Sequence, residues 1–161
     1  MVPLAACQQV STKPEAASAS QPVERVTFEH ANRCIKALEL SDVGQLVFTQ
    51  VLYSKSVAPE HKELLVSNKT INDAQRSVLE QFIEKNKTCR TLRLQAFDDY
   101  ELRQVLSEHY ERMDALFAAL LSKQLTIGQA NAQLNENFER YQATIKKIIN
   151  RSREVDEDRV G

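Results

Sequence analysis

Residues 99–150 read DYELRQVLSEHYERMDALFAALLSKQLTIGQANAQLNENFERYQATIKKIIN, and this stretch decides the fold. On either side of a short break, apolar residues recur at the spacing of one face of an α-helix. They are Leu102, Leu106, Met113, Phe117 and Leu120 before the break, and Ile127, Ala130, Leu134, Phe138, Tyr141, Ile145 and Ile148 after it. Because only residues 122–125 separate the two helices, the sequence predicts an antiparallel αα-hairpin with Phe138 in its core.

Helix caps and apolar periodicity place further helices upstream of this hairpin. The expected elements are residues 23–40, a helix from Ser41 or Asp42 to about Ser54, a short helix beginning near Pro59 and carrying Leu64, Leu65 and Val66, and a long helix from Asn72 to about Gln95. Two pairs, Asn72 with Gln75 and Thr126 with Gln129, have the spacing of capping boxes. We therefore expect an all-α fold, a small helical bundle of about five to six helices over residues 23–150.

Composition agrees with this fold class and narrows the function. The 161-residue chain is 42% hydrophobic, has a net charge of -1, and contains only 3 Gly and 4 Pro, too few for the turns of a many-stranded fold. Near-neutral charge is not typical of a nucleic-acid binder, and no apolar run is long enough to span a membrane. Residues 151–161 are too charged to bury and are predicted to form a disordered tail.

Near the N-terminus, Leu4-Ala5-Ala6-Cys7 resembles the lipobox of bacterial lipoproteins at every position. The resemblance implies removal of a signal peptide, acylation of Cys7 with chains such as palmitate, and, because Gln8 is not Asp, a periplasm-facing anchor in the outer membrane. A working signal needs a basic region and roughly 7 to 15 apolar residues before the cleavage site. Only Met1–Pro3 precede the motif. Either the leader is missing from this sequence or the motif is a chance match.

The composition of the segment after Cys7 predicts a flexible tether. Residues 8–22, QQVSTKPEAASASQP, contain almost no large apolar side chain, so burial cannot offset the entropy of ordering them. With the lipobox, this makes residues 1–22 a flexible anchor segment. The alternative is an ordinary frayed terminus.

Two cysteines remain for the bundle, Cys34 and Cys89, each on or beside the apolar stripe of a predicted helix. In an oxidising compartment two thiols that face one core are expected to pair. The bridge would close a loop of about 55 residues and contribute ~4 kcal/mol in the chain-entropy model. Two buried free thiols, acting as small apolar residues, are the alternative.

No pattern of a catalytic, cofactor or metal site is present. His30, His61 and His109 fall on separate predicted helices, without the spacing of a metal-binding pair. His109 lies on an apolar stripe, where a core-edge histidine with one hydrogen-bond partner is expected. The acidic cluster at residues 98–101 begins a helix, where the helix dipole favours carboxylates. We therefore predict no enzyme activity, no cofactor, no metal and no small-molecule substrate.

One further stretch carries a resemblance. Residues 125–129, LTIGQ, fit the LTxxQ motif of the CpxP/Spy-like periplasmic helical proteins, and residues 71–75, INDAQ, look like a degenerate second copy. That family implies stress sensing and ATP-independent chaperoning. The chain departs from it in having two predicted core cysteines, only 2 Met and no marked basic surface.

Two functions follow as expectations. The first is a non-catalytic, membrane-tethered envelope lipoprotein whose helical body binds a protein partner, with no nucleic acid and with membrane contact through the lipid anchor only. The second is a CpxP/Spy-like periplasmic chaperone or stress sensor.

Overall fold

In the computed structural model, residues 26–160 are described, and they form five α-helices and one turn of 3-10 helix without any strand. The elements are α1 (Phe28–Leu40), α2 (Asp42–Gln50), η1 (Lys62–Leu65), α3 (Asp73–Gln95), α4 (Tyr100–Leu121) and α5 (Ile127–Val160). The predicted all-α bundle is therefore confirmed. The short helix expected near Pro59 is the 3-10 turn η1, which begins at Lys62.

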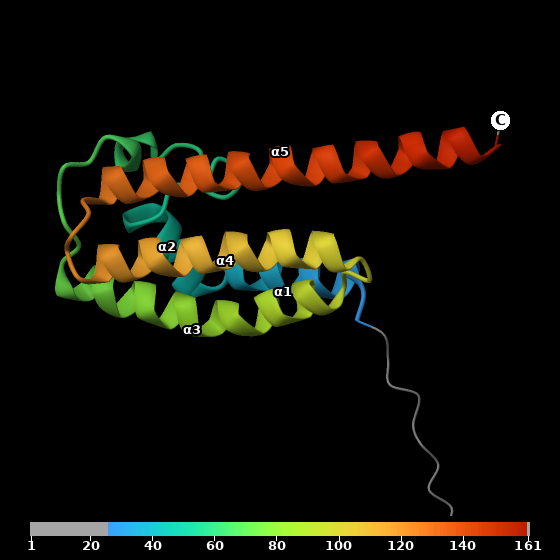
Figure 1. Ribbon diagram of the computed structural model, residues 1–161. Coiled ribbons are helices and arrows are strands. Elements are labelled where there is room, and N and C mark those ends of the chain that lie inside the picture. Colours follow the sequence, from blue (N-terminus) through green and yellow to red (C-terminus); the bar gives the residue numbers. More distant parts are fainter. Residues whose placement is uncertain (1–25, 161) are drawn as a thin grey trace, which may run out of the picture.

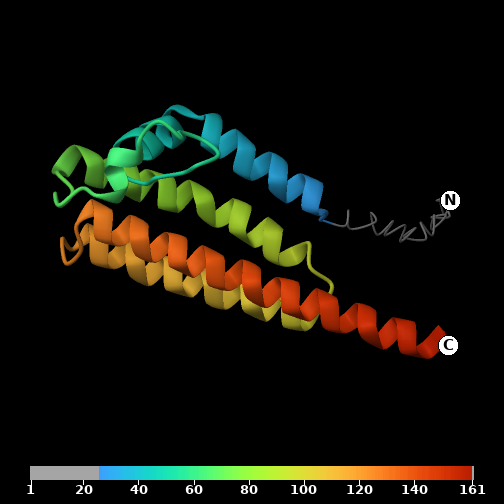
Figure 2. The ribbon, with the colours of Figure 1, turned by 90° about the horizontal axis from the view of Figure 1, so that it is seen from above.

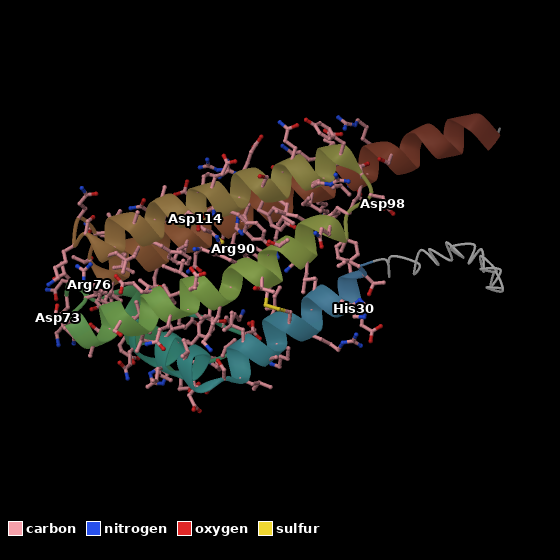
Figure 3. All side chains as sticks on the ribbon, turned by 90° about the horizontal axis from the view of Figure 1, so that it is seen from below. His30, Asp73, Arg76, Arg90, Asp98 and Asp114 are labelled. Atoms are coloured by element: carbon pink, nitrogen blue, oxygen red, sulfur yellow. A yellow bond between two sulfur atoms is a disulfide. The ribbon has the colours of Figure 1, made fainter. Side chains whose placement is uncertain are left out.

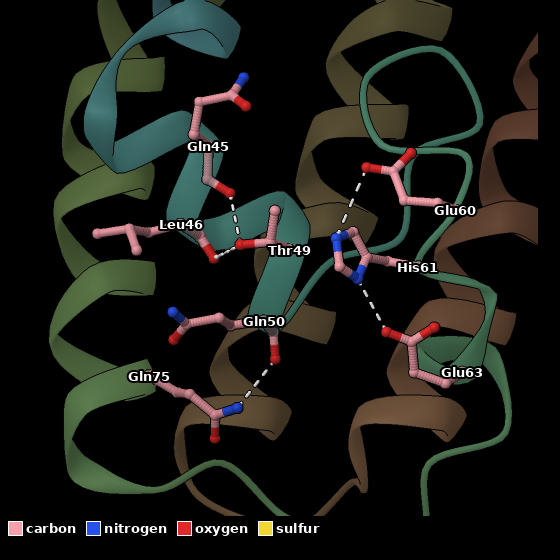
Figure 4. Close-up of polar contacts among 8 residues, drawn as sticks. All are labelled: Gln45, Leu46, Thr49, Gln50, Glu60, His61, Glu63 and Gln75. Atoms are coloured by element: carbon pink, nitrogen blue, oxygen red, sulfur yellow. Dashed lines mark hydrogen bonds and ion pairs between the residues drawn. The ribbon is translucent and has the colours of Figure 1, made fainter.

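Side-chain caps fix where helices α3 and α5 begin. Asn72 and Gln75 each accept from the other's backbone N–H at 2.9 Å. The same reciprocal pair forms between Thr126 and Gln129, at 3.2 and 2.9 Å. Both capping boxes predicted from the sequence are thus present. The Gln75 amide also donates to the Gln50 carbonyl oxygen at 2.9 Å, which ties the end of α2 to the start of α3 (Figure 4).

The four long helices form an up-and-down bundle with one side open. Figure 1 shows α3, α4 and α5 stacked along one direction, with α1 behind. The packed pairs are α1 with α3, α3 with α4, and α4 with α5. Seen from above, α3 is visible between α1 and α5, so no helix of the described region fills that side (Figure 2). The connector, residues 51–72, covers one end of it and packs through η1 on α5.

A disulfide fastens α1 onto α3. Cys34 and Cys89 are bonded, with their Cα atoms 5.4 Å apart, and Figure 3 shows the bridge in yellow between the two helices. The hydrophobic core near the bridge takes in side chains of α2, the connector, α3 and α4. Its most deeply buried large side chains are Val47, Val51, Ile71, Leu79, Leu106, Phe117 and Leu120.

Asn131, buried inside the bundle, holds the connector against α5. Its side-chain oxygen accepts from the Tyr53 backbone N–H at 2.7 Å. Its amide nitrogen donates to the carbonyl oxygens of Val51 and Ile127 at 2.9 Å and of Leu64 at 3.3 Å. A single amide therefore satisfies backbone groups on the connector that would otherwise be buried without partners.

Gly128 allows the first turn of α5 to lie directly on the connector backbone. Its N–H donates to the Ser67 carbonyl oxygen at 2.8 Å, and the Ile127 N–H donates to that of Lys69 at 2.8 Å. A Cβ at position 128 would lie 2.7 Å from the Ser67 oxygen. This close approach of two backbones requires glycine.

Helix α5 is longer than the sequence predicted. We expected a disordered tail over residues 151–161, but the helix continues to Val160. No Gly or Pro interrupts residues 129–160, and charged side chains are compatible with a solvated helix. Arg151 pairs with Glu101 of α4, and the Ser152 hydroxyl donates to the Ile148 carbonyl oxygen at 3.1 Å. The expectation of disorder is therefore wrong for residues 151–160.

Phe138 is a second correction. We expected it in the core, but it is 49% exposed, whereas Tyr141 and Ile148 on the same helix are buried. The apolar stripe of α5 is wider than the surface that α4 can cover. Phe138 therefore lies at the edge of the packed face. None of the helices in the described region has the length and apolar character of a membrane span.

Candidate functional site: an open groove between α1 and α5

The open side of the bundle holds a cavity of about 630 Å³ at the connector end. Every layer contributes apolar side chains to it. They are Ile35 and Leu38 of α1, Phe48 of α2, Phe82 of α3, Met113 and Phe117 of α4, and Leu134 and Phe138 of α5. Polar groups of Tyr53, Ser54, Lys55 and Ser56 edge it from the connector. A hollow of this size whose exposed lining is mainly apolar is typical of a binding site.

A second cavity, of about 930 Å³, continues along the same side toward the end of the bundle where α1 begins. Its apolar lining comprises Phe28, Phe97, Leu102, Ile145 and Ile149. The rings of Phe28 and Phe97 pack edge to face with their centroids 4.6 Å apart. Arg93 lines both cavities. We call the two together the open groove.

One face of α5 forms a wall along the whole open groove. Its lining residues are Leu134, Asn135, Phe138, Tyr141, Gln142, Ile145, Lys146, Ile149 and Asn150. This spacing follows a single helical face. At about 1.5 Å rise per residue the wall is roughly 24 Å long. The exposed Phe138 lies on it, so the stripe predicted for the core is in part the wall of the groove.

His109 and Tyr141 form an aromatic pair where the two cavities meet. Their rings stack at 4.7 Å, and His109 is only 6% exposed. Its Nδ1 is buried and has no hydrogen-bond partner. Burial lowers the pKa of His109 and raises the pKa of Tyr141. The imidazole is therefore favoured in its neutral form and the phenol keeps its proton.

The imidazole of His109 lies where the sequence predicted it, at the edge of the core. The backbone of His109 is bound to α5, because the Asn137 side-chain amide donates to the His109 carbonyl oxygen at 3.1 Å. The Asn137 side-chain oxygen accepts from Arg112 Nε at 2.9 Å. This buried asparagine thus joins α4 to α5 beside the groove.

A buried arginine of α3 lies near His109. Arg90 of α3 is 9% exposed and donates through Nη1 to Asp114 of α4 at 2.5 Å. Figure 3 labels both residues. Its guanidinium carbon lies 4.9 Å from the ring centre of Tyr110 and 5.8 Å from that of Phe117. Nε and Nη2 of Arg90 have no hydrogen-bond partner. Burial also raises the pKa of Tyr110.

Among the other titratable candidates, His61 lies outside the groove, whereas Asp98 and Asp99 line its second cavity. His61 contacts two exposed carboxylates, Glu63 at 2.8 Å and Glu60 at 3.6 Å (Figure 4). The hydrogen bond from His61 lowers the pKa of Glu63. Asp99 caps α4 by accepting from the Leu102 N–H at 3.0 Å, which agrees with the capping role expected for the acidic cluster. Within the described residues, no His, Cys, Asp or Glu cluster could hold a metal ion.

The remaining sequence-based site residues divide into two groups. Cys34 and Cys89 meet in the disulfide that supports the α1 wall. Cys7 and the rest of the lipobox lie outside the described residues. In the LTIGQ stretch, Thr126 and Gln129 form the capping box and Gly128 contacts the connector, so this motif has a structural role in the bundle.

Sequence reasoning missed the groove and its polar centre. Arg90 and Arg93 fall three residues apart on α3, among the apolar residues Cys89 and Leu92, and this interruption of an apolar stripe was the available signal. Buried Asn131 and Asn137 interrupt the α5 stripe in the same way. Comparisons of the chain with protein-family models, with curated proteins and with solved structures found no match in any of the three.

Proposed function

We propose that this chain is a non-catalytic binding protein of the bacterial envelope, tethered through Cys7, whose open groove receives an amphipathic helix of a partner protein. The observation that carries the proposal is the unfilled side of the bundle between α1 and α5, with its exposed Phe138. An exposed apolar surface of this extent is typical of an interaction site.

The shape of the groove favours a helix as the occupant. In an up-and-down bundle the space between two helices that flank a third is the place where a further helix packs. The α1 wall presents Phe28, Ile35 and Leu38, which share one helical face, opposite the α5 wall. The roughly 24 Å between Leu134 and Asn150 corresponds to a partner helix of about 16 residues. Such helix-in-groove binding relies on apolar anchors spaced by helical turns.

The lining of the groove also fits a binding role better than a catalytic one. Most of the lining surface is apolar. An amphipathic helix would bury Phe138 and the neighbouring apolar residues while its polar face stayed in water. The occupant is therefore expected to be a segment with apolar residues at three- and four-residue spacing.

Photocrosslinking in cells tests the groove. A photoreactive phenylalanine analogue at position 138 is expected to crosslink one protein, and mass spectrometry of the adduct should place the crosslink in an amphipathic helix. The matched control is the same analogue at Tyr100, which is 75% exposed and outside the groove. Equal crosslinking at both positions, or adducts scattered over many proteins, would contradict the proposal. Scattered adducts with suppression of client aggregation at substoichiometric amounts would instead favour the chaperone function.

The anchor is tested separately. Expressed behind a lipoprotein leader in a Gram-negative host, the protein should partition into membranes, because several acyl chains give stable anchoring where one does not. Cys7→Ser should release it and remove the mass of the acyl chains. Unchanged partition and mass in this variant would exclude lipidation at Cys7.

A further inference from the structure

We propose that the open groove binds its partner helix in coiled-coil register, with Asn135 and Gln142 of α5 pairing with uncharged amide side chains of that helix. The inference rests on the proposed function, because it specifies the sequence pattern of the helix that the groove receives. It predicts a partner segment with apolar residues at alternating three- and four-residue spacing and with asparagine or glutamine at two of these positions, seven residues apart.

Two rows of residues on α5 follow this heptad spacing. The first row consists of Ile127, Ala130, Leu134, Asn137, Tyr141, Thr144 and Ile148, and none of its members is exposed. It faces α4, as the Asn137 bond to the His109 carbonyl oxygen shows. The second row is displaced by one residue and consists of Gly128, Asn131, Asn135, Phe138, Gln142, Ile145 and Ile149. Because a heptad row packs against one neighbouring helix, two rows provide for two neighbours.

The second row is covered at its start and uncovered beyond it. Gly128 and Asn131 are buried, and both donate hydrogen bonds to the connector. The next five members all line the open groove, and all of them except Ile145 are exposed. No helix of the described region lies over this part of the row (Figure 2). The groove therefore continues, in the same spacing, an interface that the connector already fills at one end.

Asn135 and Gln142 are the polar members of the uncovered part. They are seven residues apart, so they lie on the same side of α5, about 10 Å from each other along its axis. Within residues 26–152, neither amide side chain has a hydrogen-bond partner. A helix packed on this row would shield both amides from water. Each amide would then need a donor and an acceptor on that helix.

The α5 wall of the groove is poor in charge compared with the rest of the helix. Between Leu134 and Asn150, Lys146 is the one charged residue that lines the groove. The charged residues of this stretch that do not line it are Glu136, Glu139, Arg140 and Lys147. Depletion of charge in favour of apolar and neutral polar residues is typical of the central part of a protein interface.

An uncharged amide fits the positions opposite Asn135 and Gln142 better than a charged side chain does. Residues of both signs line each cavity, namely Glu39, Lys55 and Arg93 in the first and Arg93, Asp98, Asp99 and Lys146 in the second. The lining therefore selects neither an acid nor a base. An amide both donates and accepts, and its burial avoids the desolvation cost of a charge. A polar residue at such a position fixes the register of two packed helices.

Designed helical peptides test the inference on the full chain without knowledge of the partner. Each peptide has about 18 residues, with leucine in the heptad row that would face α5 and with alanine, glutamate and lysine elsewhere. The first carries asparagine at two row positions seven residues apart, the second has leucine at both, and the third carries its two asparagines four residues apart. Isothermal titration calorimetry measures their affinities. The first peptide is expected to bind about tenfold more tightly than either of the others, because only it pairs both amides.

Equal affinities of the first and third peptides, or no binding by any of the three, would overturn the inference. Variants then assign the preference to the two amides. Asn135→Leu combined with Gln142→Leu should make the second peptide the tightest binder, because both layers become apolar. The matched control is Gln133→Leu, which changes an exposed glutamine of α5 outside the groove and should keep the original order. A preference for the first peptide that survives the combined variant would reject the amides as its source.

The two proposals fail in different ways. If the position-138 crosslink maps to a helix without two amides seven residues apart, the groove binds its partner but the register inference is wrong. If the peptides show the amide-dependent preference and no specific crosslink forms in cells, the register preference stands and the protein partner is rejected. Far-ultraviolet circular dichroism of each variant checks that the bundle is intact.

Discussion

The side-chain oxygen of Asn131 accepts the backbone N–H of Tyr53 at 2.7 Å, across a separation of 78 residues along the chain. The same side chain donates to two connector carbonyl oxygens, those of Val51 and Leu64. The connector supplies one edge of the groove. Asn131 therefore positions part of the candidate site from the opposite wall, through hydrogen bonds that apolar packing could not replace.

Asn131→Ala is expected to lower the free energy of unfolding by about 2 to 4 kcal/mol, because it leaves several buried backbone groups without partners. Urea denaturation followed by circular dichroism measures this loss. The control is Asn135→Ala, one turn further along α5, where the residue is exposed and the change should be within about 0.5 kcal/mol. Similar losses in both variants would show that Asn131 has no special role.

For Gly128→Ala, helix propensity and the contacts in the structure predict opposite signs for the change in the free energy of unfolding. Helix propensity alone would make alanine more stable by up to about 1 kcal/mol. The added Cβ would instead lie 2.7 Å from the Ser67 oxygen and 2.9 Å from its nitrogen, both backbone atoms that cannot move easily. We expect a destabilisation of about 1 to 3 kcal/mol in urea denaturation. A stabilised variant would mean that the connector relaxes away from α5.

The local features of this chain could be predicted from sequence, and the groove could not. The Asn72 and Thr126 capping boxes are short-range patterns, and the structure contains both. The end of α5 was missed because charge was taken as a sign of disorder, although a solvated helix tolerates it. Phe138 was misplaced because periodicity gives the direction of a side chain but not whether a helix covers it.

His109 should make stability depend on pH. Because burial lowers its pKa in the folded state, the unfolded chain takes up a proton first as the pH falls, so the free energy of unfolding decreases. Between about pH 7.5 and about pH 5 the unmodified protein should lose more stability than His109→Phe, which retains an aromatic ring beside Tyr141. Equal slopes for His109→Phe and the unmodified protein would contradict this account.

The disulfide should contribute substantially to stability. A bridge between residues 55 positions apart is expected to add ~4 kcal/mol by restricting the unfolded chain. The paired variant Cys34→Ser with Cys89→Ser should unfold at correspondingly lower urea concentration than the oxidised protein. Tryptic mass mapping with and without reductant, on protein exported to the periplasm of a bacterial host behind an added leader, should yield a linked peptide pair. Two separately alkylated thiols would show that the bridge does not form there.

Phe138→Ala should change stability little, whereas Phe117→Ala should cost about 3 to 5 kcal/mol. The two phenylalanines differ in burial, with Phe117 at 2% and Phe138 at 49% exposure. Thermal unfolding of both variants under the same conditions measures the contrast. A large loss for Phe138→Ala would place its ring in the core and remove it from the binding surface.

The Cys34–Cys89 bridge also determines how the protein bears mechanical force. Tension applied ahead of α1 passes from Cys34 directly across the sulfur atoms to Cys89 on α3. The intervening chain, which holds α2, the connector and most of α3, is not stretched while the bridge is intact. The connector edge of the groove therefore keeps its covalent path free of load when the N-terminal side of the molecule is pulled.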